Sequence, residues 1–208
     1  MLTVYLVEDD PLLARHVLGA FQRASDVRCV GHAARLAQAR DELPLFRPDV
    51  LLADLGLPDG DAIDLIREFG CTDVAWRPNI LVFSVFGDEV RVLEAIESGA
   101  DGYFLKGCSD PELLDAVRGA ARGESPISPG IARQVLRRLG AAPAHAAAGG
   151  ARLSPAEQAV LRLVAQGYVT EEVGERLMMT AHTVATHVRA VYGKLQPART
   201  EVLAGSVS

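Results

Sequence analysis

Residues 49–54 read DVLLAD, a short apolar run that ends on an aspartate. Three more runs have this form, each followed by a polar residue: TVYLV at 3–7 before Glu8 and Asp9, ILVF at 80–83 before Ser84, and GYFL at 102–105 before Lys106. Such runs, alternating with helical patterns, are typical of parallel strands, and open parallel sheets hold their ligands outside the carboxyl ends of the strands. We therefore expect these polar side chains to converge on one crevice.

The first 123 residues alternate between strand and helix patterns throughout. Strands are expected at 3–7, 27–31, 49–53, 79–83 and 102–105. Helical periodicity covers 11–24, 35–43, 61–69, 88–98 and 111–122. Crossovers of this length force parallel pairing and place helices on both faces of the sheet. The pattern predicts an α/β fold, a flavodoxin-like doubly wound domain with a five-stranded parallel sheet.

The composition is that of a globular protein, since 49% of the 208 residues are apolar. The longest apolar runs are far shorter than the roughly 18 residues of a membrane span. The beginning, MLTVYLVEDD, lacks the basic start of a secretory signal. The three cysteines (Cys29, Cys71 and Cys108) are far apart and odd in number, which indicates thiols in a reducing compartment. We expect a cytoplasmic protein with no membrane partner.

Charge is distributed unevenly along the chain. Residues 1–123 carry 12 Lys and Arg against 21 Asp and Glu, whereas residues 152–208 carry 6 against 5. The acidic front half suits cation binding. The back half is only faintly basic, so a nucleic-acid role depends on where its charges lie rather than on their total.

The polar residues at the strand ends suit a phosphoryl group held on a carboxylate. Two adjacent acids, Glu8 and Asp9, repel each other without a cation, and Mg²⁺ favours carboxylate oxygens. The carboxylate of Asp54 can attack phosphorus and form an acyl phosphate. Lys106 and the hydroxyl of Ser84 can then contact the phosphoryl oxygens.

These stretches resemble the receiver domain of two-component response regulators. The similar segments are YLVEDDPLL, PDVLLADLGLPDGDAIDLIRE, ILVFSVFGDE and GADGYFLKG. The resemblance implies that a sensor histidine kinase phosphorylates Asp54. It implies these further roles: Glu8, Asp9, Asp54 and the backbone carbonyl of Gly56 as ligands of Mg²⁺, Ser84 and Lys106 as phosphoryl contacts, and Tyr103 as the rotating aromatic of the switch.

Two positions depart from the receiver pattern. Gly107 stands where many receivers have a proline preceded by a cis bond, and a cis bond before a non-proline residue costs about 3–4 kcal/mol. Asp10 stands where related receivers often carry histidine. The first departure leaves the geometry of the Lys106–Gly107 bond open.

Residues 124–151 join two domains. Ser128 and Pro129 precede a short amphipathic helix that carries Ile131, Val135, Leu136 and Leu139. The segment 141–151, AAPAHAAAGGA, lacks apolar periodicity beyond alanine and is typical of a linker.

Residues 152–208 have wholly helical patterns. A capping box begins at Ser154 with proline in the first helical position, and Thr170 and Thr180 are candidate caps of two further helices. A last segment, 200–207, could form two turns. Several helices with a tight turn at 178–180 predict a small all-α helix-turn-helix domain.

The same region resembles the LuxR-type helix-turn-helix, in the segments LSPAEQAVLRLVAQG, TVATHVRAVYGKL and ARTEVL. The chain is thereby similar to the NarL/FixJ class of response regulators, whose third helix, here 181–195, enters the major groove. Its periodicity turns four residues to the core: Val184, Val188, Val191 and Leu195. The expected DNA-facing residues are His182, Thr183, Ala185, Thr186, Arg189, Lys194 and Arg199. His187 is expected to be a packed structural histidine.

Two departures from the LuxR pattern weaken the expected DNA contacts. Ala185 stands where lysine is common, and Glu171 and Glu172 open the second helix, where a positive residue often faces the phosphates. Few phosphate contacts give low affinity and a shallow salt dependence. We expect useful affinity only when a phosphorylated homodimer binds paired half-sites.

The sequence therefore favours a phosphorylation-controlled transcription factor rather than an enzyme. An aspartyl phosphatase of the haloacid-dehalogenase type is an alternative, but it requires a second acid two residues beyond the nucleophile, and that position is Gly56. A regulator whose output is protein binding, with a degenerate helix-turn-helix, is a second alternative, supported by Ala185.

Overall fold

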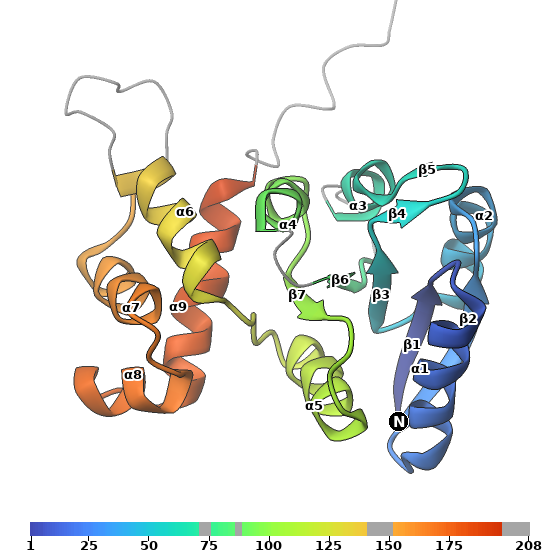
Figure 1. Ribbon diagram of the computed structural model, residues 1–208, viewed down its shortest axis with the longest axis horizontal. Helices are drawn as coiled ribbons and strands as arrows, with labels where there is room; N and C mark the ends of the chain where they lie inside the picture. Colours follow the sequence, from blue (N-terminus) through green and yellow to red (C-terminus); the bar gives the residue numbers. More distant parts are fainter. Residues whose placement is uncertain (71–75, 86–88, 141–151, 197–208) are drawn as a thin grey trace, which may run out of the picture.

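The computed structural model describes residues 1–70, 76–85, 89–140 and 152–196, without the side chain of Ser84. Five parallel strands form one sheet in the order β2-β1-β3-β6-β7 (Figure 1). The strands are β1 (Leu2–Val7), β2 (Val27–Ala33), β3 (Val50–Asp54), β6 (Asn79–Ser84) and β7 (Gly102–Leu105). This order confirms the flavodoxin-like prediction, and it brings the carboxyl ends of β1, β3, β6 and β7 to one edge.

Five helices cover the two faces of this sheet (Figure 1). They are α1 (Pro11–Arg23), α2 (Leu36–Phe46), α3 (Ala62–Gly70), α4 (Glu89–Glu97) and α5 (Asp110–Ala121). Helices α1 and α5 pack on one face, through residues such as Val17, Phe21 and Val117. Helices α2, α3 and α4 pack on the other, through residues such as Leu43, Ile66 and Leu93.

A small antiparallel ribbon follows β3 and was not expected from the sequence. It consists of β4 (Gly56–Leu57) and β5 (Gly60–Asp61). Gly60 has a φ of 149°, which favours glycine in this tight connection.

Four helices form the rest of the described chain. They are α6 (Pro129–Gly140), α7 (Pro155–Ala165), α8 (Thr170–Leu177) and α9 (Ala181–Leu195). The predicted capping box at Ser154 and the predicted cap at Thr180 are both present. The prediction that Thr170 caps α8 is wrong: Val169 is the N-cap, and the Glu172 carboxylate accepts the hydrogen bond from the Val169 backbone N–H, at 3.1 Å. The candidate linker 141–151 and the segment 200–207 lie outside the described residues.

The turn between α8 and α9 is tight, as the helix-turn-helix prediction requires. Met178 lies in the left-handed region, with a φ of 53°. A Cβ on Gly174 would lie 2.7 Å from the carbonyl oxygen of Met179, so only glycine permits this approach.

The helical module packs against the receiver-like domain at α4 (Figure 1). Tyr192 of α9 is fully buried, and its hydroxyl donates to the carbonyl oxygen of Pro126 at 2.7 Å. Gln196 donates to the carbonyl oxygen of Ala100 at 3.1 Å. One apolar core therefore continues from the sheet through α6 to α9. Among the described helices, none combines the length and apolar character needed to cross a membrane.

Candidate functional site

Three carboxylates meet where β1 and β3 end. Ligand atoms of Glu8, Asp9 and Asp54 all lie within 4.8 Å of one another. Glu8 and Asp9 follow β1 directly, and Asp54 is the last residue of the adjacent β3. The parallel register of these strands brings acids 45 residues apart into one cluster, as the sequence predicted.

Lys106 joins this cluster from the end of β7. Its Nζ lies 2.9 Å from Oδ2 of Asp54 and 3.0 Å from Oε2 of Glu8. The ammonium also lies 5.4 Å from the ring centroid of Phe83, a cation–π contact. Burial on its own lowers the pKa of Lys106, but the hydrogen bonds to Asp54 and Glu8 outweigh it and raise that pKa. Lys106 is therefore charged and positioned on the two acids.

Glu8 is the most buried member of the site, with 1% of its surface exposed. Burial raises its pKa, and the nearby charge of Asp54 raises it further, while Lys106 opposes both. Its Oε2 is buried, and its one charged neighbour there is the ammonium of Lys106 at 3.0 Å, in a geometry that does not make a regular hydrogen bond. A buried carboxylate beside two more acids, with a single ammonium shared among them, fits a divalent cation with oxygen ligands.

Asp54 presents a different environment on each of its two oxygens. Oδ1 accepts a hydrogen bond from the backbone N–H of Leu55 at 2.8 Å, and Oδ2 contacts Lys106. The side chain keeps 15% of its surface exposed. The carboxylate is thus oriented, and solvent still reaches it.

Other predicted residues lie around this centre. Gly56 begins the β4 ribbon two residues after Asp54 and is exposed. Ser84 ends β6, paired in register with Leu105, and its side chain lies outside the described part of the chain. The Lys106–Gly107 bond, which the sequence left open, is trans, and Gly107 has a φ of 91°, a conformation that favours glycine.

Tyr103, the predicted switch aromatic, is buried, with 8% of its surface exposed. Its side chain interacts with Ser128, which also caps α6 by accepting from the N–H of Ile131 at 3.2 Å. Burial raises the pKa of Tyr103, so the phenol is neutral at physiological pH. The residue therefore connects β7 to the first turn of α6.

The predicted DNA-facing residues are placed unequally. His182 and Thr186 are exposed on α9, whereas Thr183, Ala185 and Arg189 are partly buried. The expectation that Lys194 faces outward is wrong, because its Nζ donates to Oε1 of the buried Glu157 at 2.8 Å. Arg199 lies outside the described residues.

Of the expected core-facing positions, Val184, Val188 and Val191 are buried, and Leu195 is partly buried against the same core.

Side chains of α9 contact the receiver-like domain, and no sequence pattern predicts these contacts. Arg189 donates from Nη2 to Oδ1 of Asn79 at 3.1 Å and lies 3.6 Å from Oδ1 of Asp101. Nδ1 of His182 lies 3.8 Å from Oε1 of Glu124. These pairs depend on how the two modules pack, which no local pattern records.

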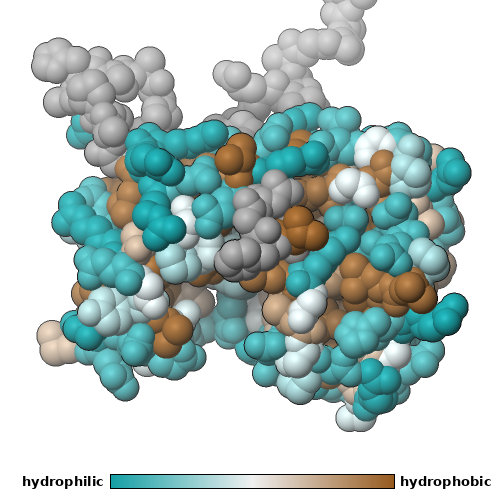
Figure 2. Space-filling view, in the orientation of Figure 1, coloured by the Kyte–Doolittle hydropathy of each residue, from teal (hydrophilic) through white to brown (hydrophobic). Residues whose placement is uncertain are grey.

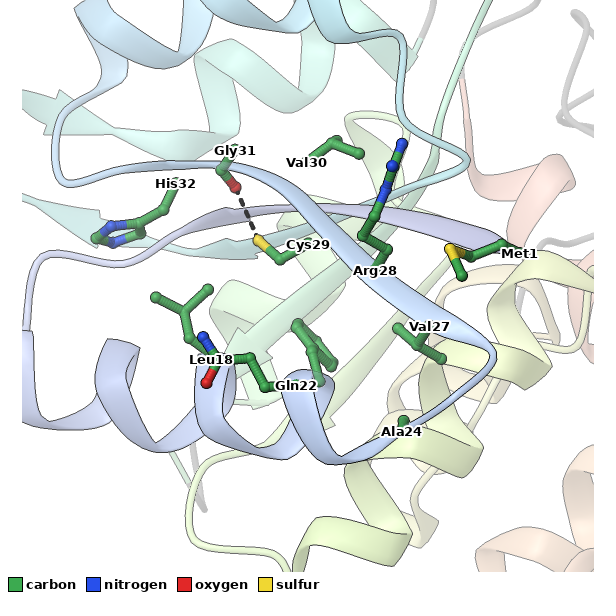
Figure 3. A pocket seen from close by; sticks show the side chains of 11 residues that line it. Met1, Leu18, Gln22, Ala24, Val27, Arg28, Cys29, Val30, Gly31 and His32 are labelled. Atoms are coloured by element: carbon green, nitrogen blue, oxygen red, sulfur yellow. Dashed lines mark hydrogen bonds between the residues drawn. The ribbon is translucent and has the colours of Figure 1, made fainter.

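A separate groove of about 490 Å³ lies between α1 and the edge strand β2 (Figure 3). It is lined by residues that include Leu18, Gln22 and Cys29, and by none of the acids or the lysine of the cluster. The Cys29 thiol donates to the carbonyl oxygen of Gly31 at 3.1 Å. Burial raises the pKa of this thiol, so it stays protonated and unreactive.

Comparison with known families assigns both modules. The receiver domain family of response regulators matches residues 4–118, and the LuxR family of bacterial regulatory proteins matches residues 151–204. The nitrate/nitrite response regulator protein NarL of Escherichia coli K12 is 31% identical over 194 residues, covering 93% of this chain and 89% of NarL.

Two further proteins agree with this assignment. The DNA-binding transcriptional activator DevR/DosR of Mycobacterium tuberculosis is 29% identical over 94% of this chain and 88% of its own length. The crystal structure of the response regulator ChrA of a heme-sensing two-component system covers 96% of this chain and 92% of ChrA, at 25% identity and a TM-score of 0.51. This chain therefore belongs to the NarL/FixJ class of two-component response regulators, which control transcription through a receiver domain and a LuxR-type helix-turn-helix.

Proposed function

We propose that a sensor histidine kinase phosphorylates Asp54 and that this charge controls the binding of α9 to DNA. The observation that carries the proposal is the position of Lys106, whose Nζ lies within 3.0 Å of both Asp54 and Glu8. An ammonium that contacts two carboxylates at the strand ends lies close enough to pair with a phosphoryl group on Asp54.

The carboxylates of Glu8, Asp9 and Asp54 and the carbonyl oxygen of Gly56 would hold Mg²⁺. The ion supplies positive charge that neutralises phosphoryl oxygens. In the transfer, an oxygen of Asp54 forms the O–P bond, the P–N bond of the kinase phosphohistidine breaks, and the departing imidazole takes up a proton. Leu55 N–H orients the carboxylate for this attack.

The phosphoryl charge would act on α9 through β7. Lys106 would turn toward the new oxygens, with the hydroxyl of Ser84 as the second proposed phosphoryl contact, and Tyr103 would follow because it lies in β7, the strand that leads to Lys106. Because Tyr103 interacts with Ser128, its movement would loosen the first turn of α6 and the packing of α9 against the receiver domain. Release of α9 frees Arg189 and His182 from Asn79 and Glu124.

The released module would bind DNA as a phosphorylated homodimer on paired half-sites. The proposed contacts are His182, Thr183, Ala185, Thr186, Arg189 and Arg199. Because Lys194 is paired with Glu157 and Ala185 carries no charge, each module has few phosphate contacts. Two linked modules bind DNA more tightly than one module does, which compensates for the weak binding of each module alone. We place this activity in the cytoplasm and assign no enzymatic turnover.

A regulator whose output is protein binding is the second candidate. The pairing of Lys194 with Glu157 favours it, because it removes one cation from the expected DNA surface. DNA binding by the phosphorylated protein, measured by gel shift with its own upstream DNA, separates the two candidates.

Labelling by acetyl phosphate with Mg²⁺ tests the acceptor. The parent protein is expected to gain one phosphoryl group, seen as an acid-stable and base-labile mass increase, and Asp54→Ala to gain none. Equal labelling of the variant would place the acceptor elsewhere and contradict the proposal.

A further inference from the structure

The backbone of Glu8, at the end of β1, is held by the neighbouring strand β2. The Glu8 N–H donates to the carbonyl oxygen of Ala33 at 3.0 Å, and the Glu8 carbonyl oxygen lies 2.9 Å from Nε2 of His32. Because a carbonyl oxygen only accepts hydrogen bonds, Nε2 of His32 carries a proton and is the donor. Figure 3 shows the His32 ring on the side of β2 that faces α1. Both backbone groups of Glu8 are therefore fixed by residues of β2.

The hydrogen bond from His32 orients two acids, although it contacts only one of them. The Glu8 carbonyl belongs to the peptide unit that joins Glu8 to Asp9, and the atoms of a peptide unit, from one Cα to the next, lie in one plane. A donor that fixes the direction of this carbonyl therefore also fixes the direction of the Asp9 N–H. Glu8 and Asp9 supply two of the three carboxylates whose ligand atoms lie within 4.8 Å of one another. A rotation of this plane would change the spacing within the acid cluster.

Side chains of α2 hold β2 in place at His32. Nε2 of Gln38 donates to the carbonyl oxygen of His32 at 3.3 Å and to Oε1 of Glu42 at 2.9 Å. Oε2 of Glu42 accepts from the hydroxyl of Tyr5 at 2.7 Å, and Tyr5 is fully buried in β1. These contacts connect the core of the sheet, through α2, to the backbone that carries the imidazole. The ring of His32 therefore has a defined position beside Glu8.

The spacing of the carboxylates matters because like charges repel and because Mg²⁺ is exacting. Three carboxylates in one cluster move apart unless the backbone that carries them is held. Mg²⁺ requires nearly ideal octahedral geometry with short bonds to oxygen, so a small displacement of a ligand weakens binding. Residues that orient metal ligands without touching the metal typically change its affinity by about 10-fold to 100-fold when they are replaced.

We propose that His32 is a positioning residue of the magnesium site. Its Nε2–H holds the peptide between Glu8 and Asp9 in the orientation in which both carboxylates reach one cation. His32 acts through the backbone and is not itself a ligand. The inference deepens the proposed function and rests on it, because it concerns the affinity of the acid cluster for Mg²⁺.

The hydrogen bonds that support His32 are remote from the helix-turn-helix module. In the sheet, β2 is the edge strand at the opposite end from β7. Figure 1 shows β2 and α2 on the far side of the receiver domain from α6 to α9, and Figure 2 shows a cleft between the two lobes on this side of the molecule. A substitution of His32 is therefore expected to act on the acid cluster and to leave the packing of α9 unchanged.

Calorimetric titration of the full chain with Mg²⁺ tests the proposal. His32→Leu removes the donor, and we expect it to raise the Kd for Mg²⁺ about five-fold or more. His32→Gln places an amide N–H near the position of Nε2, and it should keep the Kd within about two-fold of the parent value. His16→Leu is the matched control, since His16 lies on α1 and pairs with Asp110 of α5 at 3.2 Å. This control should leave the Kd unchanged.

The melting temperature of each variant without Mg²⁺ separates the proposed role from a merely structural one. A histidine that only stabilises the fold would lower the melting temperature of His32→Leu and leave its Kd for Mg²⁺ at the parent value, which would overturn the proposal. An equal loss of Mg²⁺ affinity in His32→Leu and His16→Leu would overturn it as well. So would an equal loss in His32→Leu and His32→Gln, because the donor would then have no specific part.

Two results distinguish a failure of this inference from a failure of the proposed function. A parent protein without measurable Mg²⁺ affinity would overturn the magnesium site, and the inference with it. A parent that binds Mg²⁺ with the same Kd as His32→Leu would overturn the inference alone. Nitrogen nuclear magnetic resonance of the His32 ring adds a readout that does not involve Mg²⁺. A proton on Nε2 is expected, and a neutral ring protonated only on Nδ1 would contradict the hydrogen bond to Glu8.

Discussion

Arg189 of the candidate DNA-facing helix donates from Nη2 to Oδ1 of Asn79, the first residue of β6, at 3.1 Å. Asp101 lies 3.6 Å from the same guanidinium nitrogen and is itself held by the N–H of Ile80 and by Arg77. The receiver domain thus holds oxygen acceptors in place for Arg189, a side chain that is proposed to bind DNA. Such partly exposed pairs contribute about 1 kcal/mol, so a modest new charge is enough to displace them.

Asn79→Ala should therefore favour release of α9 without phosphorylation. The substitution removes the acceptor of Arg189 and leaves Arg189 itself intact. A loss of about 1 kcal/mol from the closed arrangement predicts an increase of up to five-fold in the DNA affinity of the unphosphorylated chain. Fluorescence anisotropy with the protein's own upstream DNA measures this. Unchanged affinity would show that the pair does not restrain α9.

Tyr103→Phe should loosen the first turn of α6, because it removes the hydroxyl that interacts with Ser128. We expect amide hydrogen exchange in α6 to become about three-fold faster, from a loss of about 0.7 kcal/mol. Tyr5→Phe is the matched control, since the Tyr5 hydroxyl donates to Glu42 at 2.7 Å, on α2. Equal acceleration in both variants would refute a specific connection between Tyr103 and α6.

Lys106→Met should leave Glu8 and Asp54 without their common cation. Removal of one partner from a largely buried group of charges is expected to reduce the free energy of unfolding by about 2–4 kcal/mol at pH 7. Mg²⁺ should raise the melting temperature of the variant more than that of the parent, because it supplies the missing positive charge. Chemical unfolding and thermal melts, with and without Mg²⁺, give both quantities. An equal Mg²⁺ effect in the two proteins would contradict a site formed by these acids.

Glu157 provides a prediction about pH. Burial raises the pKa of Glu157, but hydrogen bonds from Lys194 and Ser154 outweigh it and hold that pKa below its usual range. A carboxyl whose pKa is lowered by folding stabilises the fold fully above its unfolded pKa, and this contribution disappears as pH falls through the folded pKa.

Glu157→Gln is therefore expected to reduce the free energy of unfolding by about 1.5–3 kcal/mol at pH 7. The difference between variant and parent should shrink below pH 4.5. Urea unfolding at several pH values checks this. A difference that stays constant down to pH 3 would mean that the ion pair with Lys194 contributes little.

Strand positions were predictable because buried parallel strands are nearly continuous apolar runs. The segment 102–105 agrees with β7 at both ends, and Asp54 was expected just beyond a strand that in fact includes it. The end of α2 was not predictable. The helix continues through Pro44 to Phe46 and ends at Arg47, which has a φ of 45°. A proline usually breaks a helix, yet α2 includes Pro44 and continues for two residues beyond it.

The acid cluster was predictable from topology, since parallel strands deliver their ends to one edge. The pairing of Lys106 with Glu8 was not predictable. The sequence pattern indicates a phosphoryl partner for Lys106, and it contains no information on how the buried charges pair when no phosphoryl group is present. The contact between Arg189 and Asn79 joins residues 110 positions apart in different modules. No local periodicity, cap or turn signal carries such information.

The most direct measurement compares the affinity of the full chain for its own upstream DNA before and after treatment with acetyl phosphate and Mg²⁺, in the parent and in Asp54→Ala. The account predicts that treatment strengthens binding by the parent about ten-fold or more, equal to about 1.4 kcal/mol, and leaves Asp54→Ala unchanged. An equal increase in both proteins, or none in the parent, would contradict control of DNA binding by a charge on Asp54.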